Sequence, residues 1–260
     1  MQAAPAAPLF SAIAPEAAGM PLYRVVKRSL LGAIESGRCP PGQALPSETQ
    51  IAGVMGVSIG TLRRAVDELA AEHILVRRQG RGTFVATHPP SRFLFQFFHV
   101  ERADGLREAP HVELVSFERL RAADEAAQAL NLRPGDAVIQ IENRLQLQGR
   151  AVIYDRLTLP ATLFKGLSEK RFRERPGTIY QLYQSDYAIT VLRAVERARA
   201  SGADRHAMRV LGLAAGQPVL QVLRTALTFG DRPVEYRVST LDTTHHDYVQ
   251  LPSRPATAPD

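Results

Sequence analysis

Between residues 20 and 70, apolar side chains recur at the three- and four-residue spacing that gives a helix one buried face. Three such stripes follow one another along the chain: Tyr23, Val26, Leu30 and Ile34; Ile51, Ala52 and Met55; and Leu62, Ala65, Val66 and Leu69. Each stripe predicts an amphipathic helix. Gly37 with Pro40 and Pro41 is expected to end the first one.

The second and third helices are predicted to be short, capped and joined by a tight turn. Ser47 stands three residues before Gln50, the spacing of a capping box, and Ser58 is placed to cap the third helix. Gly56 permits the sharp turn between them. The first turns of such a second helix enter the major groove in helix-turn-helix proteins, and its free amides favour a phosphate. The outward residues there are Gly60, Thr61, Arg63 and Arg64.

Two short apolar runs, residues 74–76 and 83–86, flank a stretch rich in glycine and cations. This pattern predicts a two-stranded hairpin. Its tip consists of Arg77, Arg78, Gln79, Gly80, Arg81 and Gly82. Glycines let the tip backbone approach a phosphate chain, and Arg81 can reach a minor-groove edge. The whole predicts a winged helix-turn-helix.

The chain beyond residue 92 contains a weak internal repeat. The segment from Leu130 matches the segment from Leu211 at an offset of 81 residues, and of 82 residues after Gly230. Each copy reads as the end of a helix, a glycine turn, a long strand, a glycine-containing hairpin and a second strand. Two such hairpins favour one antiparallel sheet.

Further elements are expected to complete this sheet domain. Additional strands are predicted near residues 111–121 and 188–200, and helices around residues 123–130, 161–173, 178–187 and 203–211. The predicted fold class is therefore α+β, an N-terminal winged helix-turn-helix joined to a C-terminal antiparallel sheet domain with flanking helices. The expected organisation is a disordered tail 1–19, a DNA-binding domain 20–87, a linker 88–92, a sheet domain 93–250 and a disordered tail 251–260.

Composition adds little to this picture. Of the net charge of +6, the first 90 residues carry half, so the motif rather than the charge supports DNA binding. The single cysteine, Cys39, excludes an intramolecular disulfide and fits a reducing cytosol. The N-terminus lacks a basic start and a continuous apolar run, and no window of about twenty residues is apolar enough to span a bilayer. We expect a cytoplasmic protein with no membrane partner.

The residues quoted so far resemble the GntR family of bacterial transcription regulators. The resemblance runs from Pro21-Leu22-Tyr23 through Leu45-Pro46-Ser47-Glu48 to residues 78–85, Arg-Gln-Gly-Arg-Gly-Thr-Phe-Val. It implies a dimeric regulator that reads a palindromic operator in double-stranded DNA. The predicted DNA-contacting residues are Ser47, Ser58, Gly60, Thr61, Arg63, Arg64, Arg78, Gln79, Gly80, Arg81, Gly82 and Thr83.

The chain departs from the GntR pattern at two positions. Thr49 and Ile59 stand where the family usually has arginine. An arginine there can pair with guanine in a bidentate manner, and neither threonine nor isoleucine can. We therefore expect the family's mode of DNA binding but not a borrowed operator sequence.

The C-terminal region resembles the UTRA effector-binding module of the HutC branch of this family. The resemblance rests on Leu132 with Gly135, Leu213 with Gly216, the Ile179-Tyr180 helix and residues 233–236, Pro-Val-Glu-Tyr. It implies a small-molecule pocket and dimerisation through the sheet. The candidate effector-binding residues are Arg144, Asp155, Thr178, Tyr180, Glu235 and Tyr236.

Strand parity refines these candidates. Asp155, Glu235 and Arg237 share one parity on the second strands of the two hairpins, so we expect them on one face. Asn143 and Leu145 stand where family members that recognise sugar phosphates have an Arg-x-Arg pair, and Arg144 between them lies on the opposite strand face. This argues against a phosphorylated sugar as the ligand.

Plainer interpretations apply to several of these residues. Asp155 and Glu235 can be ion-paired strand residues without a ligand. Aromatic residues after the linker are more typical of core or interface than of a pocket wall: Phe93, Phe95, Phe97 and Phe98. Adjacent strand residues point oppositely, so His245 and His246 favour a surface turn over a metal site. Arg193, Arg197 and Arg199 beside Glu196 are typical of a solvated charged face.

Three functions remain open on the sequence. The first is a ligand-responsive transcription regulator, interpreted as a repressor, that needs no cofactor. The second is an enzyme, because the UTRA fold resembles that of chorismate lyase; no Ser-His-Asp grouping, phosphate-binding loop or metal-ligand spacing supports it. The third is an architectural DNA coater without an effector, which the long sheet domain disfavours.

Overall fold

The computed structural model describes residues 9–13, 20–72, 74–87 and 97–250. These fall into two compact units, one reaching Thr87 and the other covering residues 97–250. The predicted linker 88–92, the predicted tail 251–260, and Phe93 and Phe95 lie outside the described residues.

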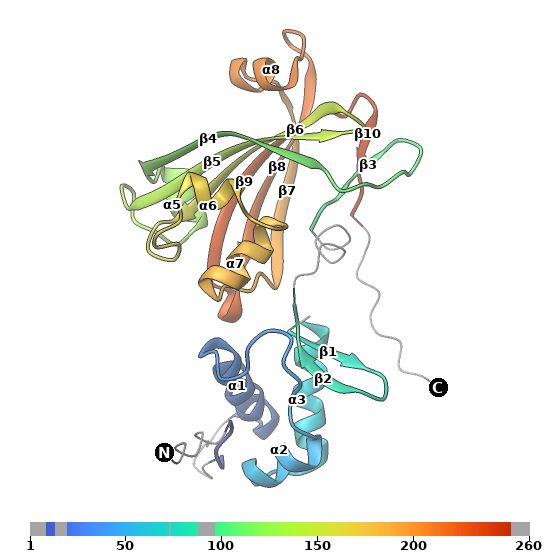
Figure 1. Cartoon of the computed structure of the whole chain (residues 1–260), viewed down its shortest axis with the longest axis vertical. Helices are drawn as coiled ribbons and strands as arrows, with labels where there is room; N and C mark the ends of the chain where they lie inside the picture. The colour runs from blue at the N-terminus through green and yellow to red at the C-terminus, as the bar shows by residue number, and fades with distance from the viewer. Residues whose placement is uncertain (1–8, 14–19, 73, 88–96, 251–260) are drawn as a thin grey trace. The chain divides into compact units, whose positions relative to one another are not determined.

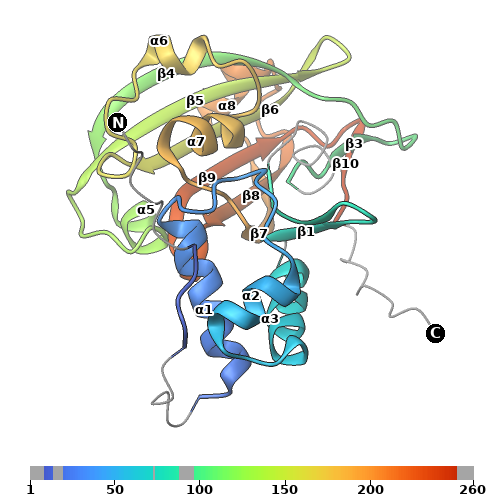
Figure 2. The ribbon, with the colours of Figure 1, turned by 60° about the horizontal axis from the view of Figure 1, so that its bottom comes forward.

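The first unit is a three-helix bundle followed by a hairpin (Figures 1 and 2). Its helices are α1 (Leu22–Glu35), α2 (Glu48–Met55) and α3 (Ile59–Ala71), and its strands are β1 (Leu75–Arg78) and β2 (Gly82–Val85). The three predicted apolar stripes supply the core, with Val26, Leu30 and Leu62 at most 1% exposed. The helix-turn-helix and its wing are therefore confirmed.

The predicted caps set the boundaries of α2 and α3. Ser47 and Gln50 form a reciprocal capping box, and Gly56 closes α2 in the left-handed region at φ 67°. The hydroxyl of Ser58 accepts a hydrogen bond from the amide of Thr61 at 3.1 Å. These local contacts fix the angle at which α3 leaves the turn.

Residues 9–13 pack on the helical bundle. Phe10 is 4% exposed, and the amide of Ile13 donates to the carbonyl of Met55 at 3.1 Å. The guanidinium of Arg38 donates to the carbonyl of Leu9. These contacts hold residues 9–13 of the predicted tail on the bundle, and the disorder of the tail stays a prediction.

The second unit is built on a six-stranded antiparallel sheet of order β4-β5-β6-β9-β8-β7. The strands are β4 (His111–Arg121), β5 (Ala137–Leu147), β6 (Arg150–Pro160), β7 (Arg193–Gly202), β8 (Pro218–Leu227) and β9 (Pro233–Leu241). The repeated hairpins β5-β6 and β8-β9 meet at the centre, where β6 pairs with β9. The predicted α+β class and its antiparallel sheet are confirmed.

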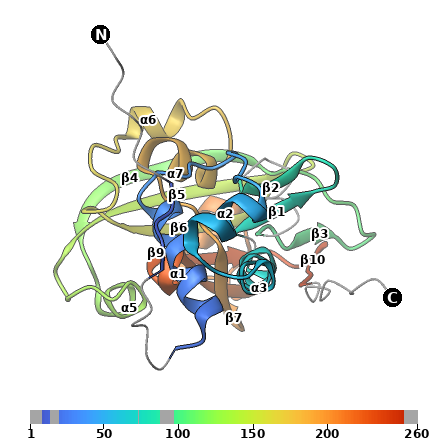
Figure 3. The ribbon, with the colours of Figure 1, turned by 90° about the horizontal axis from the view of Figure 1, so that it is seen from below.

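Helices cover both faces of this sheet. On one face, α6 (Glu169–Arg173) and α7 (Ile179–Tyr187) lie together (Figures 2 and 3) and pack through Phe172 and Tyr183 on Ile141 and Leu157. On the opposite face, α5 (Asp124–Ala129) packs on Tyr236. The helix α8 (Arg205–Leu211) packs on Tyr154 of the same face.

Several boundaries differ from those predicted. Only residues 169–173 of the expected helix 161–173 are helical, since the chain turns at Gly166, whose φ is 78°. The last edge strand begins at Arg193 rather than near residue 188, because Ala188 adopts a left-handed φ of 54° to end α7. A short 3-10 helix, η1 (Phe229–Asp231), forms the β8-β9 turn.

A second, two-stranded sheet was not predicted. It pairs β3 (Val100–Arg102) with β10 (His246–Tyr248) in antiparallel register. The surface turn expected at His245 and His246 is therefore wrong for His246, which begins β10 and is 6% exposed. Phe97 and Phe98 are both buried in the apolar core, as the plainer interpretation expected.

Candidate DNA-binding surface and ligand cavity

The N-terminal turn of α3 presents the predicted recognition residues to solvent. Ser58, Gly60 and Arg63 are exposed and Thr61 is half-buried. The hydroxyls of Ser58 and Thr61 lie 2.9 Å apart, so each orients the other. The side chain of Ser47 is held in the cap of α2. Small polar groups and one long cation thus share the helix end that carries the positive pole of the dipole.

Glu48 organises the cations beside this helix end. Its carboxylate accepts a hydrogen bond from Nε of Arg63 at 2.6 Å and lies 3.7 Å from the guanidinium of Arg77. Arg77 also pairs with Asp67 at 2.6 Å. Sequence reasoning missed Glu48, because its partners lie 15 and 29 residues further along the chain and meet it only once α2 and α3 have packed.

Two of the predicted DNA-contacting arginines rest on aromatic rings. The guanidinium of Arg64 lies 4.0 Å from the centroid of Tyr23, and that of Arg78 lies 4.6 Å from the centroid of Phe84. Both positions are exposed. Stacking of this kind restricts a long side chain without removing its charge from solvent.

The tip of the β1-β2 hairpin is a tight turn without bulky side chains. Gly80 and Gly82 adopt φ values of 68° and 98°, which a residue with a Cβ rarely adopts, and the amide of Arg81 donates to the carbonyl of Arg78 at 2.9 Å. Gln79 and Arg81 are exposed, and Arg81 forms no ion pair within the described part of the chain. The carbonyl of Thr83 anchors the wing by accepting from Leu45.

The second unit contains a cavity of about 220 Å³ between the sheet and the segment joining α6 to α7. Its walls are largely apolar, with a few polar groups that converge on the interior. The lining residues are Ala109, Pro110, Val112, Asn143, Leu145, Asp155, Leu157, Phe172, Arg175, Gly177, Thr178, Ile179 and Arg237. Such a combination is typical of a small-molecule site.

A buried charge network forms the sheet wall of this cavity. Arg237 donates to Asp155 at 3.2 Å and to Glu235 at 3.0 Å, and the hydroxyl of Ser239 donates to Asp155 at 2.5 Å. The shared face predicted from strand parity is therefore confirmed. The carboxylates of Glu235 and Asp155 raise the pKa of Arg237 against the opposing effect of burial, so the guanidinium stays charged.

Two tyrosines extend the network behind the cavity wall. The hydroxyls of Tyr183 and Tyr180 donate to Glu235 at 2.6 Å and 3.3 Å. Burial, with the charge of Glu235, raises the pKa of Tyr180 to about 12 and raises the pKa of Tyr183 as well. Both hydroxyls therefore remain donors at neutral pH, and Glu235 is fully buried with its charge compensated.

The six predicted effector residues divide into three groups. Asp155 and Thr178 line the cavity, and the hydroxyl of Thr178 caps α7 at its rim. Tyr180 and Glu235 lie in the layer behind it. The structure does not bring Arg144 and Tyr236 to the cavity.

Arg144 and Tyr236 project from the opposite face of the sheet. Arg144 pairs with Glu113 at 2.5 Å, and Tyr236 packs with Ala126 and Leu130. Their assignment to the cavity is corrected on this ground. Side chains alternate between the two faces along a strand, so Arg144 is directed away from its neighbours Asn143 and Leu145.

Arg175 and Asn143 line the cavity and were not predicted as site residues. Arg175 donates to the carbonyl of Phe172 at 2.6 Å and stacks 4.2 Å from its ring, while its Nε has no partner in the part of the chain that the structure describes. Burial lowers the pKa of Arg175. Asn143 is 4% exposed, and its Oδ1 has no hydrogen-bond partner among the residues described. No motif marks either position, because their surroundings come from distant parts of the chain.

A second buried cluster lies where the chain enters the unit. Glu196 accepts hydrogen bonds from Arg224 and from the hydroxyl of Tyr248, and Nε2 of His99 lies 3.7 Å from the same carboxylate. Burial lowers the pKa of His99. The solvated charged face predicted for the arginines of β7 holds for Arg193, Arg197 and Arg199, which are exposed, but not for Glu196, which points inward.

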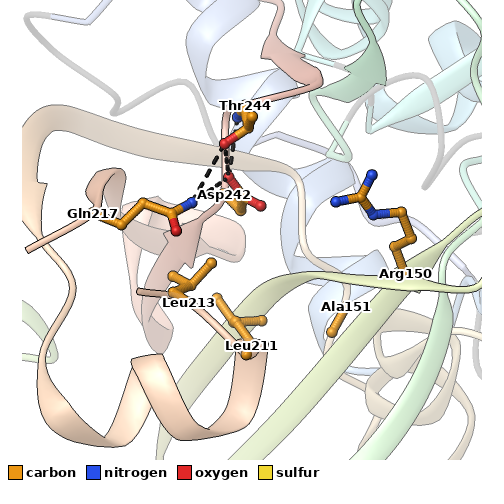
Figure 4. Close-up of a pocket in the computed structure, with 8 residues that line it drawn as sticks. Arg150, Ala151, Leu211, Leu213, Gln217, Asp242 and Thr244 are labelled. Carbon is orange, nitrogen blue, oxygen red and sulfur yellow. Dashed lines mark hydrogen bonds between the residues drawn. The ribbon is translucent and has the colours of Figure 1, made fainter. Parts of the chain in front are cut away.

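A larger cleft, of about 450 Å³, lies beside α8 (Figure 4). Asp242 accepts hydrogen bonds there from Gln217 and Thr244, and Arg150 lies across the cleft without a bond to them. The polar groups at the Asp242 side therefore satisfy one another. Within the described residues, no three His, Cys, Asp or Glu side chains are grouped to hold a metal ion.

No helix within the described ranges is long and apolar enough to cross a membrane.

Comparisons with known proteins match both units. The model of the bacterial regulatory proteins of the gntR family matches residues 22–85, and the model of the UTRA domain matches residues 106–247. The chain is 30% identical over 224 residues to the histidine utilization repressor of Pseudomonas putida, covering 82% of this chain and 85% of that protein. It is 25% identical to the HTH-type transcriptional repressor NagR of Bacillus subtilis, covering 90% and 96%.

A solved structure extends the match to the second unit. The ligand-binding domain of a GntR-family transcriptional regulator from Bordetella bronchiseptica aligns with a TM-score of 0.57 at 32% identity. The alignment covers 60% of this chain and 98% of that domain.

Proposed function

The chain belongs to the GntR family of bacterial regulators and carries a UTRA domain, and we propose on this basis that it is a homodimeric repressor released from a palindromic operator by a small metabolite. Family membership makes it a DNA-binding transcription regulator and not an enzyme. The chorismate-lyase-like alternative and the architectural coater are accordingly set aside.

One arrangement carries the DNA-binding half of the proposal. The capped N-terminus of α3 presents Arg63 in a fixed orientation against Glu48, and the glycine-rich wing presents Arg81, which has no ion pair in the described ranges. A recognition helix in the major groove and a cationic finger on the backbone or minor groove would use these groups in different ways. Arg63 would read base edges, and Arg81 would supply affinity.

The cavity carries the effector half. It is closed on one side by a sheet with buried charges and on the other by α6, α7 and their connection. Two of the relatives are named for the utilization of nitrogen-containing compounds, histidine and fructoselysine, so a nitrogen-containing metabolite is the first class of effector to test.

A buried path joins the cavity to the start of the second unit. Arg237 contacts Glu235, Glu235 accepts from Tyr180, and the ring of Tyr180 meets that of Phe97 edge-on at 5.0 Å. Phe97 is the first described residue after the connection to the DNA-binding unit. A ligand that shifts Arg237 would thereby alter how the chain leaves the sheet domain. Coupling of about 1–3 kcal/mol suffices to change operator affinity about tenfold.

The proposal is tested by selecting DNA fragments with the purified full chain and measuring affinity by gel shift. We expect selected sites to contain two inverted half-sites about one helical turn apart. Arg63→Ala should weaken binding to the selected site about tenfold or more, while Arg28→Ala, an exposed arginine on α1, should not. Selection of no common sequence, or equal affinity of Arg63→Ala and the parent, would contradict the proposal.

A further inference from the structure

The cavity contains a positive group that has no counter-ion among the described residues. Arg175 forms no ion pair within the described residues; its one hydrogen bond goes to the carbonyl of Phe172. Its Nε is buried without a partner. Keeping a partly buried cation in this state costs stability, because neither water nor a carboxylate compensates it fully. Such a cost is expected where a ligand supplies the missing anion.

The sheet wall opposite offers hydrogen-bond acceptors. Asn143 and Asp155 are directly paired on β5 and β6, and both line the cavity. Asn143 is 4% exposed, and its amide forms no hydrogen bond within the described residues. Asp155 accepts hydrogen bonds from Arg237 and Ser239, but a carboxylate can accept up to about four. A hydrogen-bond donor on the ligand would therefore find two acceptors on this side.

The negative and positive charges of the cavity lie on different walls. Asp155 and Glu235 share the single cation Arg237, so the sheet side holds an excess of negative charge. The positive charge of Arg175 lies on the α6–α7 connection, beside the N-terminus of α7. A dianion such as a sugar phosphate would meet one unpaired guanidinium and an adjacent carboxylate. A monoanion with a donor at its other end matches both sides.

We propose that the effector is a small monocarboxylic acid whose carboxylate pairs with Arg175 and whose far end donates an N–H or O–H to Asn143 and Asp155. The volume of about 220 Å³ restricts it to a small metabolite, below the roughly 300–1,000 Å³ of typical ligand pockets. Val112, Leu145 and Leu157 also line the cavity, so an apolar or planar segment joining the two polar ends of the ligand fits it. This inference rests on the proposed function and narrows its effector.

The first test needs no ligand. Arg175→Met keeps the length of the side chain on Phe172 but removes the unpaired charge, so the melting temperature of the full chain should stay equal or rise. Arg173→Met is the matched control, since Arg173 is exposed and paired with Glu169 on the outside of α6. A clear fall in melting temperature for Arg175→Met, with none for the control, would show that Arg175 serves the fold and would overturn the inference.

The second test uses defined probes. Thermal shift of the full chain is measured with the twenty free amino acids, pyrrole-2-carboxylate and nicotinate, with prolinamide, pyrrole-2-carboxamide and nicotinamide as uncharged counterparts, and with glucose 6-phosphate. A saturable shift is expected for at least one acid and not for its amide. Arg175→Gln should weaken binding of that acid at least tenfold and Asn143→Leu at least fivefold, while Arg173→Gln changes it less than twofold.

The outcomes separate the inference from the proposed function. Binding by amides or glucose 6-phosphate in place of the acids, no shift with any acid, or unchanged acid binding in Arg175→Gln overturns the inference. If a non-acid probe releases the selected operator, the repressor function stands and only the ligand class fails. If an acid binds through Arg175 but leaves operator affinity unchanged, the ligand class stands and the effector function fails.

Discussion

The DNA-binding surface and the ligand cavity both place arginine beside carboxylate, in opposite physical settings. The side chains of Arg63 and Glu48 are 64% and 29% exposed, whereas those of Arg237, Asp155 and Glu235 are 7%, 3% and 0% exposed. The first pair is screened by water and salt, so it directs a side chain without contributing much to stability. The second cluster is desolvated, so its members depend on one another.

This difference determines what each region tolerates. A partner such as DNA can displace Glu48 from Arg63, because solvent and phosphate replace the lost contact at little cost. Nothing comparable reaches Glu235, whose charge is compensated, within the described residues, by Arg237 and two tyrosine hydroxyls. The DNA-binding surface is therefore suited to exchange of partners, and the cavity wall to holding one geometry into which a ligand fits.

The largest expected effect is the loss of the buried cation. Arg237→Leu leaves Asp155 and Glu235 without their shared counter-ion and should lower the free energy of unfolding by about 3–5 kcal/mol. Urea denaturation of the full chain measures it. Adding Asp155→Asn and Glu235→Gln to Arg237→Leu should restore much of the loss. No difference between Arg237→Leu and the exposed-site variant Arg173→Leu would remove the distinction between the two regions.

A smaller effect is expected at the cap of the recognition helix. Ser58→Ala removes the acceptor for the amide of Thr61 and should cost about 1 kcal/mol of stability in the first unit. It should also weaken DNA binding, since the hydroxyl of Thr61 loses its neighbour. Ser58→Asp, which restores the cap, is the control for stability. Recovery of stability without recovery of DNA affinity would show a separate contact from the hydroxyl to DNA.

The pH dependence tests the buried cluster of the second unit. Burial lowers the pKa of His99 below its ordinary value of about 6.5, so the unfolded chain binds the proton first. Stability contributed by neutral His99 should therefore be lost as pH falls below about 6.5, by at most about 1.4 kcal/mol at pH 5.5. His99→Gln should flatten this part of the profile. His246→Gln provides the comparison, because burial also lowers the pKa of His246.

The smallest effect on stability is expected at the exposed pair. Glu48→Gln should leave the denaturation midpoint unchanged within error, because water compensates the guanidinium of Arg63. Its effect should appear in DNA binding. The affinity for random-sequence DNA should rise a few-fold, and the preference for the selected operator should fall. A clear loss of stability in Glu48→Gln would mean that the pair is structural rather than orienting.

The first unit could be predicted from sequence almost element by element, because its determinants are local. Each cap joins residues three positions apart, Ser47 with Gln50 and Ser58 with Thr61, and Gly56 ends α2 through its own backbone conformation. Glu48 was missed because its partners lie on other elements. The same holds throughout the second unit, where Arg237 and Asp155 are 82 residues apart in the chain.

In the second unit, strand parity predicted on which face of the sheet each side chain lies but not how deeply it is buried. It brought Asp155, Glu235 and Arg237 together correctly, yet could not show that Glu235 lies behind the wall that Asp155 lines. Arg175 belongs to a connection with no periodicity, so no pattern could assign its surroundings. Residues that acquire their role only through packing against distant segments are beyond what spacing predicts.

Because Cys39 is buried, its reactivity can report the opening of the helical bundle that surrounds it. This is the only thiol in the sequence, it is fully buried after α1, and burial raises the pKa of the thiol so that little thiolate is present at neutral pH. A thiol-reactive dye can label it only in molecules whose helical bundle has opened. The labelling rate of the intact, unmodified protein thus measures the opening of the DNA-binding unit alone, in the presence or absence of operator or metabolite.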